Sequence, residues 1–382
     1  MQIAIDAHSV GTQLGGNETY AINLIEALAQ IDQENLYTLY VTQRVAVDRF
    51  TGRWPNFTVK RTLPHSPLVR IPLTLSAELR RHPVDLLHVQ YTAPPLVPCP
   101  VVTTIHDLAF EHLPETFNRR SWIQLRLTVR RTARRSAHII TVSEYSRRDI
   151  CETYGIAPER ITVTPEAAPS HFAPVTNETE LRKIRERYGI ESDYILSLGS
   201  IQPRKNLVRL IEAYSCLRRL RSDSKLPTLV LAGKRGWLDS EIFRAARQTG
   251  FGKDILFIGY ASEPDLPALY SGAVGFVYAS YFEGFGLPVV EAMQCGVPVI
   301  AGNRTSIPEV AGGAALLFDP FDTAALSNAI ARLIDDSHLR ALLRAKGFKR
   351  AKDFNWKTTA ELTLQAYRRA ARGHATTEEK AD

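Results

Sequence analysis

The chain has 382 residues, of which 45% are hydrophobic and 23% are charged, and its formal net charge is +7. This composition excludes a disordered or fibrous chain, and the length favours two domains over one. The excess of basic residues favours an acidic partner: a phosphorylated substrate, an anionic lipid or a nucleic acid.

The N-terminal segment MQIAIDAHSVG reaches Asp6 without the apolar core of a signal peptide. No stretch has the ~18 uninterrupted apolar residues that span a membrane. The four cysteines are scattered, without the spacing of metal ligands. We therefore expect a cytoplasmic protein without a structural metal.

Short apolar runs alternate with helix-length segments along the chain. Because runs that are apolar on both faces form parallel strands covered by helices on both sides, the pattern predicts an α/β fold. The runs are too many for one ordinary sheet, so we expect two doubly wound, Rossmann-like domains that face each other across a cleft. The expected strands are residues 3–7, 37–41, 86–89, 101–105 and 138–142, then 194–199, 228–233, 255–259, 274–279, 297–302 and 315–318.

A stretch rich in proline, alanine and polar residues, from Thr164 to Glu180, predicts the linker between the domains. The expected domains are residues 1–171 and 172–355. They are followed by an amphipathic helix at 356–372 and a polar, frayed tail at 373–382.

The first strand-to-helix junction reads DAHSVGTQLGGNETY and has Gly15 and Gly16 ahead of a predicted helix. Such glycines let backbone N–H groups approach a phosphate at the positive end of the helix. The spacing is not GxGxxG, which argues against a nicotinamide dinucleotide. A phosphate-binding loop and a flexible helix cap both fit this segment.

The segment VVTTIHDLAF puts His106 directly after a predicted buried strand. Ligands bind α/β sheets beyond the carboxyl ends of the strands, so this position favours a functional histidine over one that caps a loop.

Residues 119–135, RRSWIQLRLTVRRTARR, carry seven arginines, and no acidic residue occurs from Thr116 to Ser143. Apolar side chains such as Trp122 and Leu125 stand between the arginines. Two interpretations stay open: a solvated basic helix, or a helix that lies on an anionic membrane or acceptor.

In the second half, YILSLGSIQPRKN runs from a predicted strand into Arg204 and Lys205 at a helix start. Two cations beside the positive end of a helix suit a doubly charged anion such as a diphosphate. LVLAGKRGW offers a second and less certain candidate, with Lys234, Arg235 and Trp237 after the next strand.

Residues 281–302, YFEGFGLPVVEAMQCGVPVIAG, contain two glutamates around a glycine-rich turn. Pro288 fits the first position of a helix, which would put Glu291 in its first turn and Glu283 in the loop before it. An acidic first turn would explain Glu291 but not Glu283. Carboxylates accept paired hydrogen bonds from vicinal hydroxyls, so the two glutamates favour an extended ligand that contains sugar.

The spacing Glu283–x7–Glu291 within EGFGLPVVEAMQCGVPVIA resembles the signature of the retaining family 4 glycosyltransferases of GT-B fold. GSIQPRKN, TVSEYSRRDI, TIHD and NRTSIPEVAGGAALLFDP occur in the family's order and extend the resemblance over nearly the whole chain.

The resemblance implies a role for each matching residue. Arg204 and Lys205 would bind the donor's diphosphate and stabilise the charge on the leaving group. Glu291 would bind the ribose hydroxyls, Glu283 would contact the transferred sugar, and His106 would face the reacting sugar. Two further sets would line the donor: Gly15 and Gly16 in a closing loop, and the backbone of Phe285, Gly286 and Leu287.

The resemblance also implies that no metal or other cofactor is needed and that the last helix crosses back to the first domain. LAGKRGW is most similar to bacterial mannosyltransferases of polysaccharide or lipopolysaccharide assembly, which use GDP-mannose. The implied partners are a nucleotide sugar and a saccharide or lipid-linked saccharide acceptor, at the inner face of the membrane if 119–135 binds lipid.

Other functions stay open. A UDP-sugar could replace GDP-mannose as the donor. A non-catalytic nucleotide-sugar binder would bind ligand without turnover, and an epimerase would isomerise the nucleotide sugar without an acceptor. A nucleic-acid binder fits the net charge, but no nucleic-acid-binding module is recognisable, so we expect no nucleic-acid partner.

Overall fold

The computed structural model describes residues 1–13, 15–221 and 226–378, with side chains up to residue 372. It divides into two compact units. The first unit contains Met1–His112, Arg119–Glu166 and Asn355–Asp382, and the second contains Leu113–Asn118 and Ala167–Phe354. The first unit thus ends at Glu166 where the sequence predicted residue 171.

The segment Leu113–Asn118 lies inside the predicted first domain but belongs to the second unit. The side chain of Trp237 accounts for this. Its indole N–H donates a hydrogen bond to the carbonyl of Thr116, and its ring lies 6.0 Å from that of Phe117.

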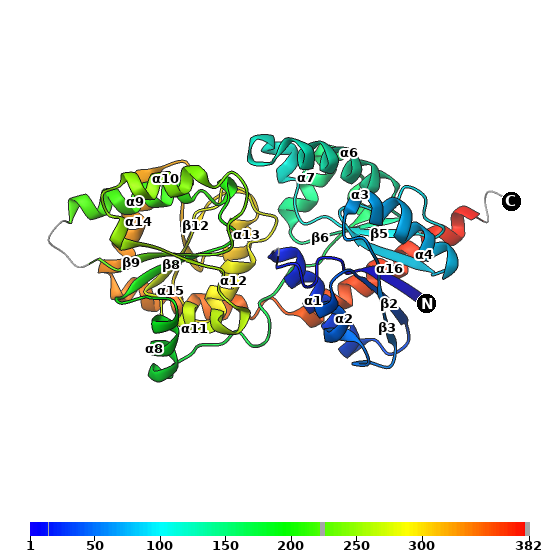
Figure 1. The fold of residues 1–382 in the computed structure, drawn as a ribbon, viewed down its shortest axis with the longest axis horizontal. Helices are drawn as coiled ribbons and strands as arrows, with labels where there is room; N and C mark the ends of the chain where they lie inside the picture. The colour runs from blue at the N-terminus through cyan, green and yellow to red at the C-terminus, as the bar shows by residue number, and fades with distance from the viewer. Residues whose placement is uncertain (14, 222–225, 379–382) are drawn as a thin grey trace. The chain divides into compact units, whose positions relative to one another are not determined.

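The first unit is built on a parallel sheet in the order β3-β2-β1-β4-β5-β6-β7 (Figure 1). The strands are β1 Gln2–Asp6, β2 Leu36–Val41, β3 Phe57–Arg61, β4 Leu86–Gln90, β5 Val101–Thr104, β6 His138–Thr141 and β7 Ile161–Val163. The helical segments are α1 Gly16–Ile31, α2 Arg44–Phe50, α3 Pro67–Val69, η1 Arg70–Leu75, α4 Ser76–Arg81, α5 Ala109–His112, α6 Arg119–Arg135, α7 Glu144–Tyr154, η3 Pro158–Arg160 and α16 Trp356–Glu378.

The second unit has a parallel sheet in the order β10-β9-β8-β11-β12-β13. Its helices α9, α10 and α14 cover one face, and α11, α12 and α15 cover the other (Figure 1). The strands are β8 Tyr194–Leu198, β9 Thr228–Ala232, β10 Ile255–Gly259, β11 Gly275–Tyr278, β12 Val299–Gly302 and β13 Ala315–Phe318. The helical segments are η2 Pro114–Thr116, α8 Glu178–Arg187, η4 Pro203–Lys205, α9 Leu207–Leu220, α10 Ser240–Gln248, η5 Gly252–Asp254, η6 Glu263–Asp265, α11 Leu266–Ser271, α12 Leu287–Gln294, α13 Ile307–Ala311, α14 Thr323–Asp335 and α15 Ser337–Ala351.

Each sheet has one place where the direction of strand addition reverses. In the first sheet this place lies between β1 and β4, and in the second it lies between β8 and β11. At such a point the loops after the two central strands diverge to opposite faces and leave room for a ligand. The residues that follow these four strands therefore lie where a ligand can bind.

The sequence predicted α/β sheets of parallel strands, and the structure confirms that fold class. Two strands, β3 and β7, were not predicted. β3 is an edge strand whose FTVKR sequence mixes apolar and charged residues, and β7 has only three residues, so neither forms a continuous apolar run.

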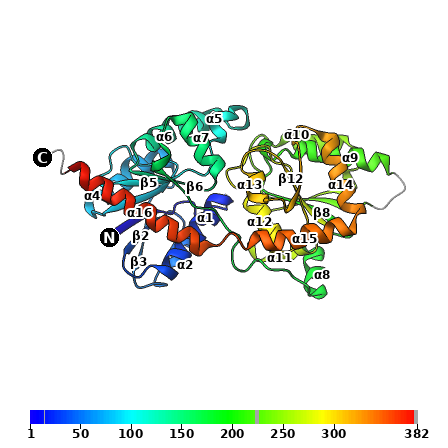
Figure 2. The ribbon, with the colours of Figure 1, turned by 180° about the vertical axis from the view of Figure 1, so that it is seen from behind.

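The last helix, α16, packs on α1 and along β4 to β7 of the first unit, where Figure 2 shows it beside the sheet. It continues to Glu378, so the first part of the predicted tail is helical, and residues 379–382 lie outside the described residues. Among the described residues no helix is both long and apolar enough to cross a bilayer.

Candidate active site

The reversal point of the second sheet carries the predicted anion site. Arg204 and Lys205 follow β8 in the short helix η4, and Glu283 follows β11. These strands are neighbours in the sheet, so residues some 80 positions apart in the sequence meet at one carboxyl edge.

One carboxylate holds both cations. Lys205 Nζ lies 2.7 Å from Glu283 Oε1, and Arg204 Nη1 lies 3.0 Å from Glu283 Oε2. Lys205 also donates to the Tyr278 hydroxyl at 2.8 Å, and the Ser280 hydroxyl donates to Glu283 Oε1. The three charged side chains are nearly buried, with exposed fractions between 9% and 16%. Interactions between charges are strong in such a site because little water screens them.

The electrostatics of Glu283 follow from this geometry. Burial by itself would raise the pKa of its carboxyl, but Arg204 and Lys205 outweigh burial and lower that pKa to about 2. Glu283 is therefore charged at neutral pH. Two cations against one carboxylate leave an excess of positive charge, which suits an incoming diphosphate.

The local backbone fixes these groups. Asn206 adopts the left-handed conformation at the N-cap of α9, and its side-chain amide donates to the carbonyls of Ala279 and Pro320 at 3.1 and 2.7 Å. Gly286, at the N-cap of α12, has φ +102°, and a Cβ there would lie 2.5 Å from Ile307 Cδ1. This position therefore requires glycine.

The second glutamate of the motif lies deeper in α12 than predicted. The helix begins at Leu287, so Pro288 is its second residue and Glu291 its fifth, outside the first turn. Glu291 is 6% exposed and accepts a hydrogen bond from the Tyr270 hydroxyl at 2.9 Å. The interpretation of Glu291 as a first-turn acid is wrong.

The turn between the two glutamates is held by hydrogen bonds to the segment after β12. The Ser306 hydroxyl donates to the carbonyls of Glu283 and Phe285, both at 2.9 Å, and the N–H of Glu283 donates to Thr305 Oγ1 at 3.0 Å. The Phe285 ring is buried against Phe354. Any contact from Phe285 to a ligand would therefore come from its backbone.

His106 stands at the carboxyl edge of the first unit's sheet, just after β5. Its Nδ1 lies 3.1 Å from Glu166 Oε1 and its Nε2 lies 3.0 Å from Gln90 Oε1. The ring of Tyr20 meets it edge to face at 4.7 Å. The imidazole is thus held in a fixed plane by partners from three parts of the chain.

The glycine loop lies next to this histidine. Gln90 hydrogen-bonds both His106 and the carbonyl of Asn17, each through its side-chain amide. Gly15 is the N-cap of α1 with φ +79°, and a Cβ added to Gly15 or Gly16 would meet nothing within 4 Å. Among the described residues, Gly15 and Gly16 thus leave space beside the positive end of α1, whose first turn also carries Glu18.

The less certain anion candidate after β9 differs from the first. Arg235 is exposed and pairs with Asp239 four residues along the chain, at 2.7 Å. Trp237 is committed to the Leu113–Asn118 segment. Neither residue joins the cluster formed by Arg204, Lys205 and Glu283.

Sequence reasoning missed the residues that position these groups. Gln90 ends β4, and Ser280 stands two residues after β11, so the rule that selected His106 would have found both. Glu166 was assigned to the linker, yet it is 5% exposed and bound to His106. Glu166 is the third residue after the short strand β7, which the sequence did not predict, so no local pattern marked it.

Comparison with known proteins places this site in a family. Residues 14–168 match the model described as Glycosyltransferase Family 4, and residues 180–350 match the one described as Glycosyl transferases group 1. The O-antigen chain mannosyltransferase B of Escherichia coli is 35% identical over 268 residues, which are 70% of this chain and 70% of that protein. The chain belongs to glycosyltransferase family 4.

Another relative and two solved structures match at lower identity. The serotype-specific mannosyltransferase WbdA of Escherichia coli is 30% identical over 62% of this chain, a region that spans 29% of WbdA. Among solved structures, the sucrose-phosphate synthase of Thermosynechococcus elongatus superposes with a TM-score of 0.76 at 20% identity, over 96% of this chain and 98% of that one. WaaG, a glycosyltransferase involved in lipopolysaccharide biosynthesis, gives 0.73 at 17% identity, over 94% and 97%. The fold is GT-B.

Proposed function

We propose that this glycosyltransferase moves mannose from GDP-mannose to a saccharide or lipid-linked saccharide in the synthesis of a cell-surface polysaccharide. The observation that carries the transferase reaction is the buried cluster of Arg204, Lys205 and Glu283 at the reversal point of the second sheet. The mannosyl preference is supported by the names of the two Escherichia coli relatives.

In this proposal the donor's diphosphate binds at Arg204 and Lys205. The cations neutralise the charge that develops on the leaving phosphate, which is the task that a divalent cation performs in other transferases. We therefore expect turnover without added metal. Glu291 binds the ribose hydroxyls, and Glu283 orients the two cations and contacts the transferred sugar.

The acceptor hydroxyl attacks the anomeric carbon from the face that the diphosphate leaves. The bond from that carbon to the phosphate oxygen breaks, and this oxygen takes the proton from the acceptor. The configuration of the donor is thereby retained. His106 faces the reacting sugar, in the plane set by Glu166 and Gln90.

The test is transfer of labelled sugar from GDP-mannose, UDP-glucose and UDP-N-acetylglucosamine to saccharide acceptors and to a lipid extract, with and without a chelator. We expect the fastest transfer from GDP-mannose, no loss of rate with the chelator, and a product whose anomeric carbon keeps the donor's configuration by NMR. Inversion would refute the reaction geometry, loss of rate with the chelator would refute the role of the cations, and a faster UDP-sugar would refute the donor.

We further propose that α6 holds the first unit at an anionic membrane, at its cytoplasmic face. All seven arginines of α6 are exposed, and the helix also exposes Ile123 and Leu127. Replacing Arg130, Arg131, Arg134 and Arg135 with glutamine should weaken binding to phosphatidylglycerol vesicles, most at low salt. Unchanged binding would refute this contact.

A further inference from the structure

The helical layer on one face of the first sheet has a gap. The crossovers from β3 to β4 and from β5 to β6 run in the same direction along the sheet, so right-handed connections put η1–α4 and α6 on the same face. The neighbouring parallel strands β4 and β5 are joined without a helix, by residues 91–100. Parallel strands usually need a helix for this step, and here the place of that helix is left to a loop.

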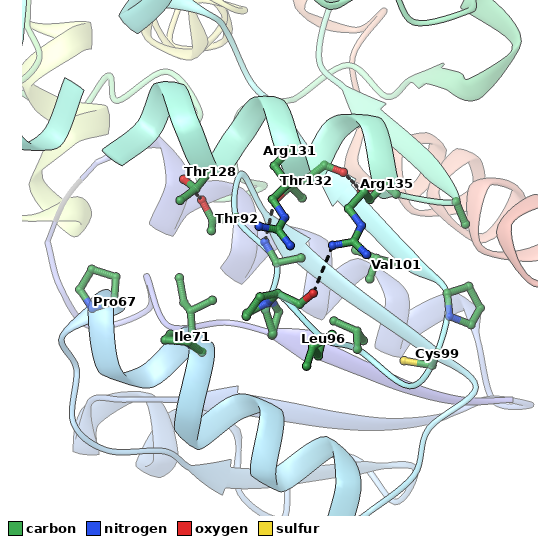
Figure 3. A pocket seen from close by; sticks show the side chains of 18 of the residues that line it. Pro67, Ile71, Thr92, Leu96, Cys99, Val101, Thr128, Arg131, Thr132 and Arg135 are labelled. Atoms are coloured by element: carbon green, nitrogen blue, oxygen red, sulfur yellow. Dashed lines mark hydrogen bonds between the residues drawn. The ribbon is translucent and has the colours of Figure 1, made fainter. Parts of the chain in front are cut away.

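A pocket of about 640 Å³ occupies this gap. Figure 3 shows α6 along one side, the helix that carries Pro67 and Ile71 along the other, and the 91–100 loop between them. The volume lies within the ~300–1,000 Å³ range of ligand-binding pockets. None of the candidate active-site residues lines it.

The walls of the pocket are apolar. Leu68 and Leu96 line it and are 70% and 63% exposed, so the pocket offers accessible apolar surface to a ligand. The loop sequence YTAPPLVPCP contains four prolines. Proline has no backbone N–H, so this loop presents few donors that an apolar ligand would leave unsatisfied.

The threonine hydroxyls in the walls have hydrogen-bond partners within the protein. The hydroxyls of Thr92 and Thr128 lie 3.0 Å apart, and Thr132 Oγ1 accepts the N–H of Ala93 at 3.1 Å. Because these three hydroxyls already have partners, hydrocarbon placed against them would leave none of them unsatisfied.

One rim of the pocket is cationic. Arg131 and Arg135 extend from α6 toward the loop (Figure 3), and Arg135 Nη1 lies 3.4 Å from the carbonyl of Pro95. No acidic residue occurs between Thr116 and Ser143, so α6 has no carboxylate of its own that could pair with its arginines in place of a ligand. A ligand that suits both parts has a hydrocarbon chain and an anionic head.

We propose that this pocket binds one hydrocarbon chain of a phosphate-bearing membrane lipid, with the lipid's head group at Arg131 and Arg135. This site would bind lipid at the membrane surface that α6 contacts in the proposed function, so it rests on that proposed contact. The pocket adds a defined site for one hydrocarbon chain. The first unit would then draw this chain out of the membrane in addition to lying on the membrane surface.

Water-soluble alkyl phosphates below their micelle concentrations test the site without membrane or turnover. By calorimetry on the full chain, we expect decyl phosphate to bind about tenfold more tightly than octyl phosphate, which is two methylenes shorter. Inorganic phosphate should neither bind measurably nor displace decyl phosphate. Equal affinities of phosphate and decyl phosphate would overturn the chain site and reveal a site for free phosphate.

Leu96→Glu is the pocket variant and Leu127→Glu its matched control. Both leucines are exposed, at 63% and 68%, and only Leu96 lines the pocket, so neither change should affect folding. We expect Leu96→Glu to weaken decyl phosphate binding at least tenfold and Leu127→Glu to change it less than twofold. Equal effects would indicate non-specific adsorption to α6 and refute the pocket.

The head-group assignment is tested with Arg131→Gln combined with Arg135→Gln. This double variant should lose affinity for decyl phosphate about tenfold and keep its affinity for the neutral decyl glucoside. Equal losses for both ligands would refute the assignment. Transfer to a soluble saccharide acceptor should be unchanged in Leu96→Glu, so failure of the lipid site and failure of the transferase are told apart.

Discussion

Two buried titratable groups, one in each unit, have lowered pKa values for opposite reasons. In the second unit, Arg204 and Lys205 overcome the effect of burial and lower the pKa of Glu283 to about 2. In the first unit, burial lowers the pKa of His88 to about 3, with the nearby His106 adding to the effect. Glu283 is thus held charged, and His88 is held neutral.

The difference reflects what each group does. Glu283 is nearly buried between Arg204 and Lys205, the two cations that bind the donor's diphosphate in the proposed function. His88 belongs to a seam of neutral hydrogen bonds: its Nδ1 lies 2.7 Å from the Tyr367 hydroxyl of α16 and its Nε2 lies 2.7 Å from Thr104 Oγ1. The charged cluster is thus the proposed binding site, whereas the neutral seam joins β4 to α16.

Removing one cation should have the largest effect. We expect Lys205→Ala to lower kcat by about 10²–10³-fold, because the charge on the leaving diphosphate loses a preorganised partner. The measurements are steady-state transfer kinetics and the binding of the nucleoside diphosphate. The control is Arg219→Ala, an exposed cation in the last turn of α9, which should leave both unchanged. Equal rates for Lys205→Ala and the unaltered chain would remove Lys205 from the reaction.

Neutralising the carboxylate should cost stability. Glu283→Gln leaves two buried cations without their counter-charge. We expect the free energy of unfolding at pH 7, measured with denaturant, to fall by about 3 kcal/mol. The folded-state pKa is below the unfolded one, so Glu283 stabilises the fold above pH 4.5 and loses this contribution as pH falls toward 2. The variant should lack this part of the acid sensitivity. If the two chains lose stability in parallel from pH 4.5 downward, Glu283 is not the group that titrates.

The sequence predicted the parts of this molecule that depend on local pattern. Arg204, Lys205 and Glu283 follow buried apolar runs, and the carboxyl edge of a parallel sheet collects such residues without knowledge of the strand order. The bounds of α6, Arg119–Arg135, were also predictable from its composition. The hydrogen-bond partners of the site residues were harder to predict. Glu166 contacts His106 from 60 residues away in the sequence, and no local pattern marks that contact. The pocket beside α6 arises from a helix that is missing between two strands, which only the strand order reveals.

The neutral seam in the first unit allows a smaller and more selective test. Tyr367→Phe removes the partner of a buried imidazole nitrogen, and we expect it to lower the free energy of unfolding at pH 7 by about 1–2 kcal/mol. Tyr40→Phe is the matched control. Tyr40 is as fully buried as Tyr367 and lies in β2, in the sheet that contains His88. Its hydroxyl has no hydrogen-bond partner among the described residues, so its removal should be neutral or stabilising.

The acid response of this seam separates it from the charged cluster. Because the folded-state pKa of His88 is below the unfolded value, the unfolded chain takes up a proton first, and stability falls as pH drops from 6.5 toward 3. Burial causes this shift, so Tyr367→Phe should keep the same pH dependence at a lower overall stability. Thermal unfolding between pH 7 and 5 lies above the range in which Glu283 titrates. Burial also lowers the pKa of His138 and of His65, so the measurement compares the variant with the unaltered chain, in which these two histidines contribute equally. If the variant flattened the pH dependence in this range, the hydrogen bond to Tyr367 would be what keeps His88 neutral, and the contrast with Glu283 would fail.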